Sequence, residues 1–134
     1  MRFTLNPTFM EVFQAIQSEN IDSLQKIISA NSNTVNATDQ RGFTPLILAT
    51  YLGKTEVAKL LLNNGADVNA RDSAGNTALM GVSYKGNIEM AKLLLSKGAK
   101  IELTNKNGEK ALDFASRAGN HEMEKILMKS EIVA

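Results

Sequence analysis

The chain has 134 residues, of which 43% are hydrophobic, and its 15 Lys and Arg residues against 14 Asp and Glu residues give a formal net charge of +1. This length predicts a single domain over residues 1–134, and the hydrophobic content is enough for a continuous core. The balanced charge gives no electrostatic reason to expect a nucleic acid, an anionic membrane or a polyanionic substrate as a partner.

The chain contains no cysteine, which excludes disulfides, thiolate chemistry and cysteine ligation of a metal. The N-terminus has no basic start followed by an apolar segment, and no window approaches the length of a membrane span. We therefore expect a cytoplasmic protein, a monomer, without a cofactor.

The first part of the chain, about residues 5–38, is predicted to hold two helices. Asn6 and Pro7 are a cap and first-turn pair that predicts the start of the first helix. A constant sequence period runs through the chain and aligns this part with residues further along: Phe13 falls under Leu46, Ile16 under Ala49 and Asn20 under Gly53. Because asparagine tolerates the left-handed conformation, we expect Asn20 to end its helix as Gly53 ends the equivalent one.

The next part begins with a clear helix start. Thr44 can cap exposed helical N–H groups, and Pro45 is well tolerated at the first helical position. This helix is predicted to end at Gly53, where a residue with positive φ lets the chain reverse. A second helix carries an apolar face over residues 57–62 and closes at Gly65.

The remaining parts repeat this pattern. An Asp-x-x-Gly turn precedes the third helix pair, in which Asp72 can bond its own backbone and Gly75 can turn left-handed, so we expect a row of projecting hairpins. In the last pair, Lys110 occupies the position of the capping residues Thr44 and Thr77, so we expect this helix to lack a side-chain N-cap. Since terminal units of a stack have one face in water, we expect the modified first and last units to act as caps of a complete chain.

Two sets of glycines recur with the same period of 33 residues, at positions 42, 75 and 108 and at positions 53, 86 and 119. Such a period indicates stacked units that cannot bury their apolar faces alone. The units themselves resemble the ankyrin repeat, as in Asp39-Gln-Arg-Gly-Phe-Thr-Pro-Leu46, Asp72-Ser-Ala-Gly-Asn-Thr-Ala-Leu79 and Asn105-Lys-Asn-Gly-Glu-Lys-Ala-Leu112.

The resemblance covers nearly the whole chain and implies an all-α repeat solenoid of four ankyrin repeats, each a helix-turn-helix with β-hairpin loops. The repeats are expected at about residues 5–38, 39–71, 72–104 and 105–134.

The residues give little support for catalysis. His121 is the only histidine, so a histidine-pair metal site is impossible, and a Ser-His-Asp arrangement would need Ser116, His121 and Asp113. These residues lie on one helix and the turn after it, without a strand-to-helix elbow or an evident oxyanion donor. We predict no catalytic residues and no metal site.

Asn69 has two interpretations. Leu61 followed by Asp67-Val68-Asn69 matches the pattern in which asparagines of ankyrin repeats are hydroxylated by an oxygen-dependent hydroxylase in animals. The structural interpretation is that Asn69 fixes its loop through side-chain hydrogen bonds, and Asn36 occupies the same place in the period.

In ankyrin proteins the residues that the scaffold does not require lie on the hairpin tips and inner helices, which form a concave face. We therefore predict a partner-binding site at Gln40, Arg41, Phe43, Tyr51, Arg71, Ser73, Asn76, Tyr84, Lys85, Lys106, Asn107, Glu109 and Arg117.

Tyr51, Tyr84 and Arg117 occupy the same position in successive periods and are expected to form a ladder of hot-spot residue types. The alternative is that the tyrosines only fill the groove between helices and hairpins.

These features favour a non-enzymatic protein–protein interaction module that binds one protein partner. A narrower alternative is a stoichiometric inhibitor, or an immunity or accessory protein, of a single enzyme or toxin. Two further alternatives are an enzyme or small-ligand protein, disfavoured by a shallow groove without catalytic residues, and an inert structural scaffold.

Overall fold

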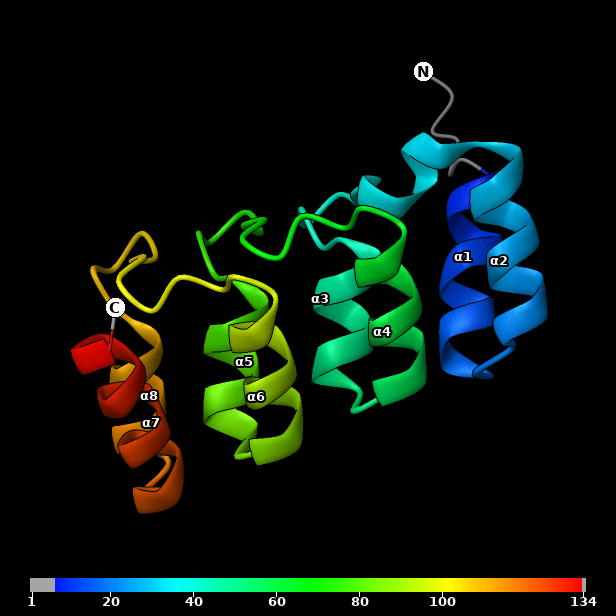
Figure 1. The fold of residues 1–134 in the computed structure, drawn as a ribbon. Helices are drawn as coiled ribbons and strands as arrows, with labels where there is room; N and C mark the ends of the chain where they lie inside the picture. Colours follow the sequence, from blue (N-terminus) through cyan, green and yellow to red (C-terminus); the bar gives the residue numbers. More distant parts are fainter. Residues whose placement is uncertain (1–6, 134) are drawn as a thin grey trace. The chain divides into compact units, whose positions relative to one another are not determined.

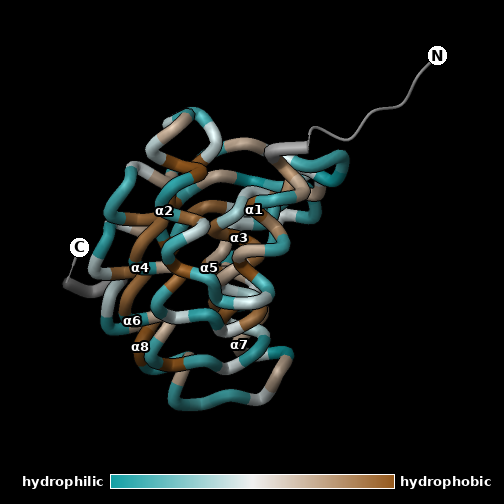
Figure 2. Tube along the Cα trace, turned by 90° about the vertical axis from the view of Figure 1, so that its right-hand side faces the viewer, coloured by the Kyte–Doolittle hydropathy of each residue, from teal (hydrophilic) through white to brown (hydrophobic). Residues whose placement is uncertain are grey.

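The computed structural model describes residues 7–133, and within this range the regular elements are helices, without a strand (Figure 1). The chain divides into two compact units, unit 1 over residues 1–67 and unit 2 over residues 68–134. The predicted cap at Asn6 lies outside the described residues. Hydrophobic residues are concentrated in the helices, whereas the loops are mostly hydrophilic (Figure 2).

Unit 1 contains two helix pairs and a short 3₁₀ helix. Its elements are α1 Pro7–Gln17, α2 Ile21–Ala30, η1 Ser32–Asn36, α3 Pro45–Tyr51 and α4 Thr55–Asn63. The members of each pair contact one another, and the pairs contact each other through α1 with α3 and α2 with α4. The core side chains are at most 1% exposed and include Val12, Ile16, Leu24, Leu46, Val57 and Leu61.

Unit 2 repeats this arrangement. Its elements are α5 Ala78–Lys85, α6 Ile88–Ser96, α7 Ala111–Arg117 and α8 His121–Val133. α5 contacts α6 and α7, and α8 contacts α7 and α6. Core side chains again are at most 1% exposed, namely Leu79, Met80, Met90, Leu94, Met123 and Leu127. A single helix pair cannot bury all of its apolar side chains, so the stability of each unit depends on the packing of one pair against the other.

The predicted helix starts are confirmed. The Thr44 hydroxyl accepts a hydrogen bond from the Ile47 N–H at 3.1 Å, and Pro45 is the first residue of α3. Thr77 occupies the same place before α5. Lys110 makes no side-chain cap; instead, the Asp113 carboxylate accepts a hydrogen bond from the Lys110 backbone N–H at 2.8 Å.

The predicted register of the first helix and its turn is wrong by one residue. Glu19, with φ of +55°, takes the left-handed conformation, whereas Asn20 has φ of −83° and caps α2. The Asn20 N–H donates to the Ala15 carbonyl as the Lys54 N–H donates to that of Ala49. The first helix and its turn therefore follow a spacing that is one residue longer than the period of the rest of the chain.

The corrected register changes the core alignment of the first helix. Ala15 lies under Ala49, Val12 lies under Leu46 and Glu19 lies under Gly53, in place of Ile16, Phe13 and Asn20. The helix cap at Asn20 accounts for the shift. The Asn20 side chain accepts the Ser23 N–H at 3.1 Å, and this bond places Asn20 at the N-cap of α2 and not at the left-handed position that ends α1.

The loops between helix pairs form the predicted turns. Asp39, Asp72 and Asn105 each donate a backbone N–H to the carbonyl four residues later, at 2.9 to 3.1 Å. Gly75, with φ of +83°, confirms the expected left-handed turn. These loops are hairpins in shape, but among residues 7–133 they contain no β-strand. Two backbone hydrogen bonds close each turn, the second from the glycine N–H back to the carbonyl of Asp39, Asp72 or Asn105.

Helix α4 offers a test of the cap contributions. Asn20 and Asn87 cap α2 and α6 through their side chains, whereas Lys54 before α4 makes no such bond. Lys54→Asn is therefore expected to raise the free energy of unfolding by about 0.5 to 1 kcal/mol, and Asn87→Ala to lower it by about 1 kcal/mol, in urea unfolding experiments.

Lys54→Ala is the control, since it removes the 3.8 Å ion pair with Glu19 without adding a cap. A Lys54→Asn variant no more stable than Lys54→Ala would contradict this interpretation of the helix start.

Candidate functional site

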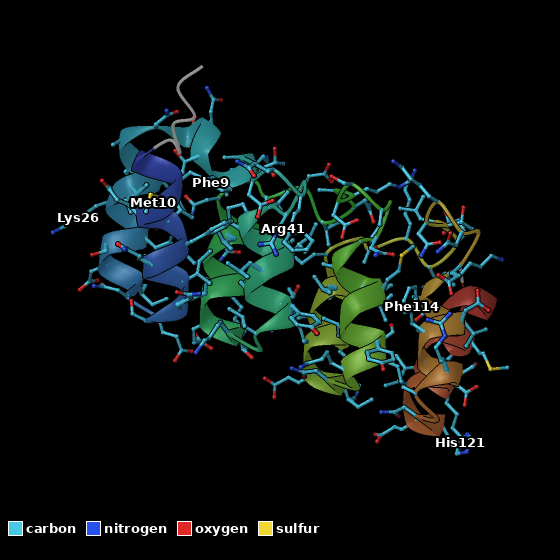
Figure 3. All side chains as sticks on the ribbon, turned by 180° about the vertical axis from the view of Figure 1, so that it is seen from behind. Phe9, Met10, Lys26, Arg41, Phe114 and His121 are labelled. Carbon is cyan, nitrogen blue, oxygen red and sulfur yellow. The ribbon has the colours of Figure 1, made fainter. Side chains whose placement is uncertain are left out.

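The predicted site residues of unit 1 lie on the turn before α3 and at the end of α3. The Asp39 carboxylate accepts hydrogen bonds from the Arg41 and Phe43 backbone N–H groups at 2.8 and 2.9 Å. The Arg41 guanidinium lies 4.5 Å from the centre of the Phe43 ring and 3.1 Å from the Asp39 carboxylate. Arg41 is labelled in Figure 3. Phe43, which has no evident core role in the sequence, thus supports an arginine whose side chain is 70% exposed. Gln40 is exposed beside it.

The two tyrosines occupy similar places in their helix pairs, near the end of the first helix of each. Tyr51 is the last residue of α3 and is 49% exposed, and Tyr84 lies one residue before the end of α5 and is 51% exposed. Aromatic side chains exposed to this degree leave contact area for another molecule at both positions, and their role in binding stays a prediction.

Unit 2 brings its two turns into direct contact. The Lys106 backbone N–H donates to the Ala74 carbonyl at 3.0 Å, and the Asn105 side chain donates to the Asn76 side chain at 2.8 Å. A Cβ added to Gly75 would lie 3.0 Å from the Lys106 nitrogen, so the two backbones touch. Around this contact the exposed predicted residues are Arg71, Ser73, Lys106 and Asn107.

Arg117 differs from the two tyrosines at the equivalent positions of the sequence period. Its guanidinium forms an ion pair with Glu109 and lies 5.0 Å from the centre of the Phe114 ring. Glu109 also accepts a hydrogen bond from the Asn105 side chain at 2.9 Å. Arg117 is therefore held along α7 toward the turn, with half of its side chain still exposed. Lys85 is exposed next to Tyr84.

Asn36 and Asn69 make the same pair of hydrogen bonds in their units. The Asn36 side chain donates to the Gly65 carbonyl at 3.1 Å and accepts the Asp67 N–H at 2.8 Å. The Asn69 side chain donates to the Gly98 carbonyl at 3.2 Å and accepts the Lys100 N–H at 2.9 Å. This confirms the structural interpretation of Asn69, whereas its hydroxylation stays a prediction.

Ser116, His121 and Asp113 do not assemble as a nucleophile, base and acid. The Ser116 hydroxyl donates to Glu124 at 2.7 Å, and His121 Nδ1 lies 2.9 Å from the other Glu124 oxygen. The pKa of Glu124 is lowered, first by the hydrogen bond from Ser116 and then by the one from His121. A hydroxyl that donates to a carboxylate is not activated by the imidazole, so this cluster links α7 to α8. Sequence spacing gave no sign of the role of Glu124.

Two surface depressions lie away from the predicted residues. One of about 420 Å³ lies over α1 and α2 in unit 1, and one of about 600 Å³ lies beside α6, residues 99–102 and α8 in unit 2. Across residues 7–133, His, Asp and Glu side chains nowhere gather in groups of three that could hold a metal ion. In the same range, each helix is too short or too polar to cross a membrane.

The repeat pattern of the chain matches that of a known protein family. A family model described as ankyrin repeats, in three copies, matches residues 12–105 and residues 73–134. The chain has no match among curated proteins.

The contact between the two turns of unit 2 can be tested with a pair of glycine substitutions. Gly75→Ala and Gly108→Ala both place alanine at positive φ, +83° and +77°, but only at Gly75 would the new methyl group meet neighbouring backbone. Gly75→Ala is expected to be the more destabilising by at least about 1 kcal/mol, because the Asn105 and Lys106 backbone must move. Urea unfolding measures the difference, and equal losses in the two variants would rule out the close approach of the turns.

Proposed function

We propose, since the chain belongs to the ankyrin-repeat family, that it is a non-enzymatic protein that binds a protein partner through its turn tips and the first helix of each pair. Ankyrin repeats are generally protein–protein interaction modules, and the family is typically non-enzymatic. In this chain the binding residues would be those predicted on the turns and on α3, α5 and α7, and the protein would act as a monomer.

The exposed tyrosines carry this proposal. Tyr51 and Tyr84 are each about half exposed, although the fold offers both units apolar interiors. Tyrosine provides a large, rigid contact area with a polar end, which is why it is frequent among residues that dominate binding energies. Arg41, which lies over the Phe43 ring on the turn before α3, adds a second exposed side chain of a type that is frequent at binding sites.

The chemistry of the remaining polar groups supports binding rather than catalysis. The Ser116 hydroxyl donates to Glu124, and the Asp113 carboxylate accepts from the Lys110 backbone N–H. The hydroxyl, imidazole and carboxylate therefore do not form the chain of hydrogen bonds that a hydrolase uses. The two surface depressions described above lie away from the predicted residues, one over α1 and α2 and one beside α6 and α8.

The proposal predicts that the partner is lost when the tyrosines are removed. The partner would be captured from lysate with the tagged chain, identified, and titrated against purified variants by calorimetry. Tyr84→Ala is expected to weaken binding about tenfold or more, and Tyr51→Ala/Tyr84→Ala further, because each truncation removes a hot-spot ring.

Met128→Ala is the matched control, since Met128 is 50% exposed on α8, outside the predicted surface, and this variant should bind as the parent chain does. Helicity of each variant is checked by circular dichroism. A partner that binds the double tyrosine variant as tightly as the parent chain would place the site elsewhere and refute the proposal.

A further inference from the structure

We propose that the turns of unit 2, together with Tyr84, bind an acidic segment of a protein partner, with aspartate or glutamate beside an apolar or aromatic residue. This inference rests on the proposed function and adds the chemistry of the partner. It follows from an imbalance between the cations and the carboxylates on the turns and first helices of unit 2.

The carboxylates of this surface are used inside the fold. Asp72 accepts the Ala74 and Asn76 N–H groups, each at 2.9 Å. Glu109 is bonded to Asn105 and Arg117, and Asp113 to the Lys110 N–H. Each carboxylate is therefore held by the geometry of a turn or a helix start, and its orientation is fixed by these partners.

Three cations of the same surface lack such partners. Arg71, Lys106 and Lys110 are exposed, and the ion pairs found among residues 7–133 involve other cations. Their charges remain in water although three carboxylates lie nearby in the chain. An incoming carboxylate would meet these cations without first displacing an internal partner.

The cations lie on one continuous part of unit 2. Lys106 is joined to the preceding turn by its backbone bond to Ala74, and that turn begins directly after Arg71. Lys110 follows the second turn and is the N-cap residue of α7, which packs against α5. Tyr84 lies near the C-terminal end of α5, roughly 10 Å along the helix from its N-cap at the turn, a distance that a short extended segment spans. In contrast, the exposed charges of α6 are one of each sign, Glu89 and Lys92.

The rest of the chain favours an acidic protein over a nucleic acid. The formal net charge is only +1, whereas nucleic-acid binding draws on several phosphate contacts and, for single strands, on successive aromatic rings. Unit 2 offers a few exposed cations on its turns and a single tyrosine about one helix length away, which suits a short acidic segment with one apolar anchor.

The test is a selection from a displayed random library of peptides of about 12 residues on the full chain, followed by fluorescence anisotropy with the enriched peptides. The enriched peptides are expected to contain more Asp and Glu than the library. Lys106→Gln/Lys110→Gln should raise their dissociation constants about threefold to tenfold, and so should an increase in NaCl from about 50 to 300 mM.

Lys92→Gln/Lys97→Gln is the matched control, since it removes two exposed charges of the same sign from α6 and its C-terminal cap. This control variant should bind the enriched peptides as the parent chain does. A single-stranded oligonucleotide of about 20 nucleotides serves as the competing probe.

The outcomes separate the two proposals. Peptides without acidic enrichment, or with equal affinity for Lys106→Gln/Lys110→Gln, would overturn the acidic partner, and the proposed function would survive if Tyr84→Ala still abolished their binding. If no peptide is enriched, or if neither Tyr84→Ala nor the lysine variant weakens binding, the acidic partner is overturned, and the proposed function is decided by the partner captured from lysate and its binding to the tyrosine variants. An oligonucleotide that binds as tightly as the peptides and is lost in the lysine variant would overturn the inference in favour of a nucleic acid.

Discussion

Two asparagine side chains that bridge neighbouring loops set the spacing on which the repeats of this chain depend. Asn36 in unit 1 and Asn69 in unit 2 each donate to a glycine carbonyl and accept a backbone N–H two residues further along. Because both partners of each bridge belong to the backbone, a single asparagine side chain fixes one helix pair against the next, whatever side chains the partner residues carry. Helix packing then supplies the buried area that a single pair lacks.

Because backbone groups and a few asparagine side chains join the repeats, other side chains on the surface are available to bind a partner. In unit 2 the turns touch through their backbones and through Asn105 and Asn76, so the side chains of Lys106 and Arg71 make no contribution to closing the fold. The same carboxylates that shape the turns are held internally, which leaves the cations unbalanced. A charge pattern that arises from turn chemistry can thus select a partner, although the chain as a whole is nearly neutral.

Features fixed by local chemistry could be predicted from the sequence, and those fixed by a contact across the fold could not. The cap at Thr44 and the turn at Gly75 follow from residue preferences, and both are confirmed. The left-handed residue of the first turn was misplaced, because a strict period cannot show that Glu19 adopts a conformation uncommon for its type. The ion pair between Arg117 and Glu109 was also missed, since it depends on how the turn meets α7; the binding role of the site residues stays a prediction.

The most direct test of the bridge is Asn69→Ala, compared with Asn63→Ala at an exposed position at the end of α4. Amide hydrogen exchange and urea unfolding would be measured on both. The bridge predicts faster exchange of the Lys100 N–H and a loss of about 1 to 2 kcal/mol in the free energy of unfolding for Asn69→Ala only. Unchanged exchange at Lys100, with stability equal to that of Asn63→Ala, would contradict a structure that depends on this bridge.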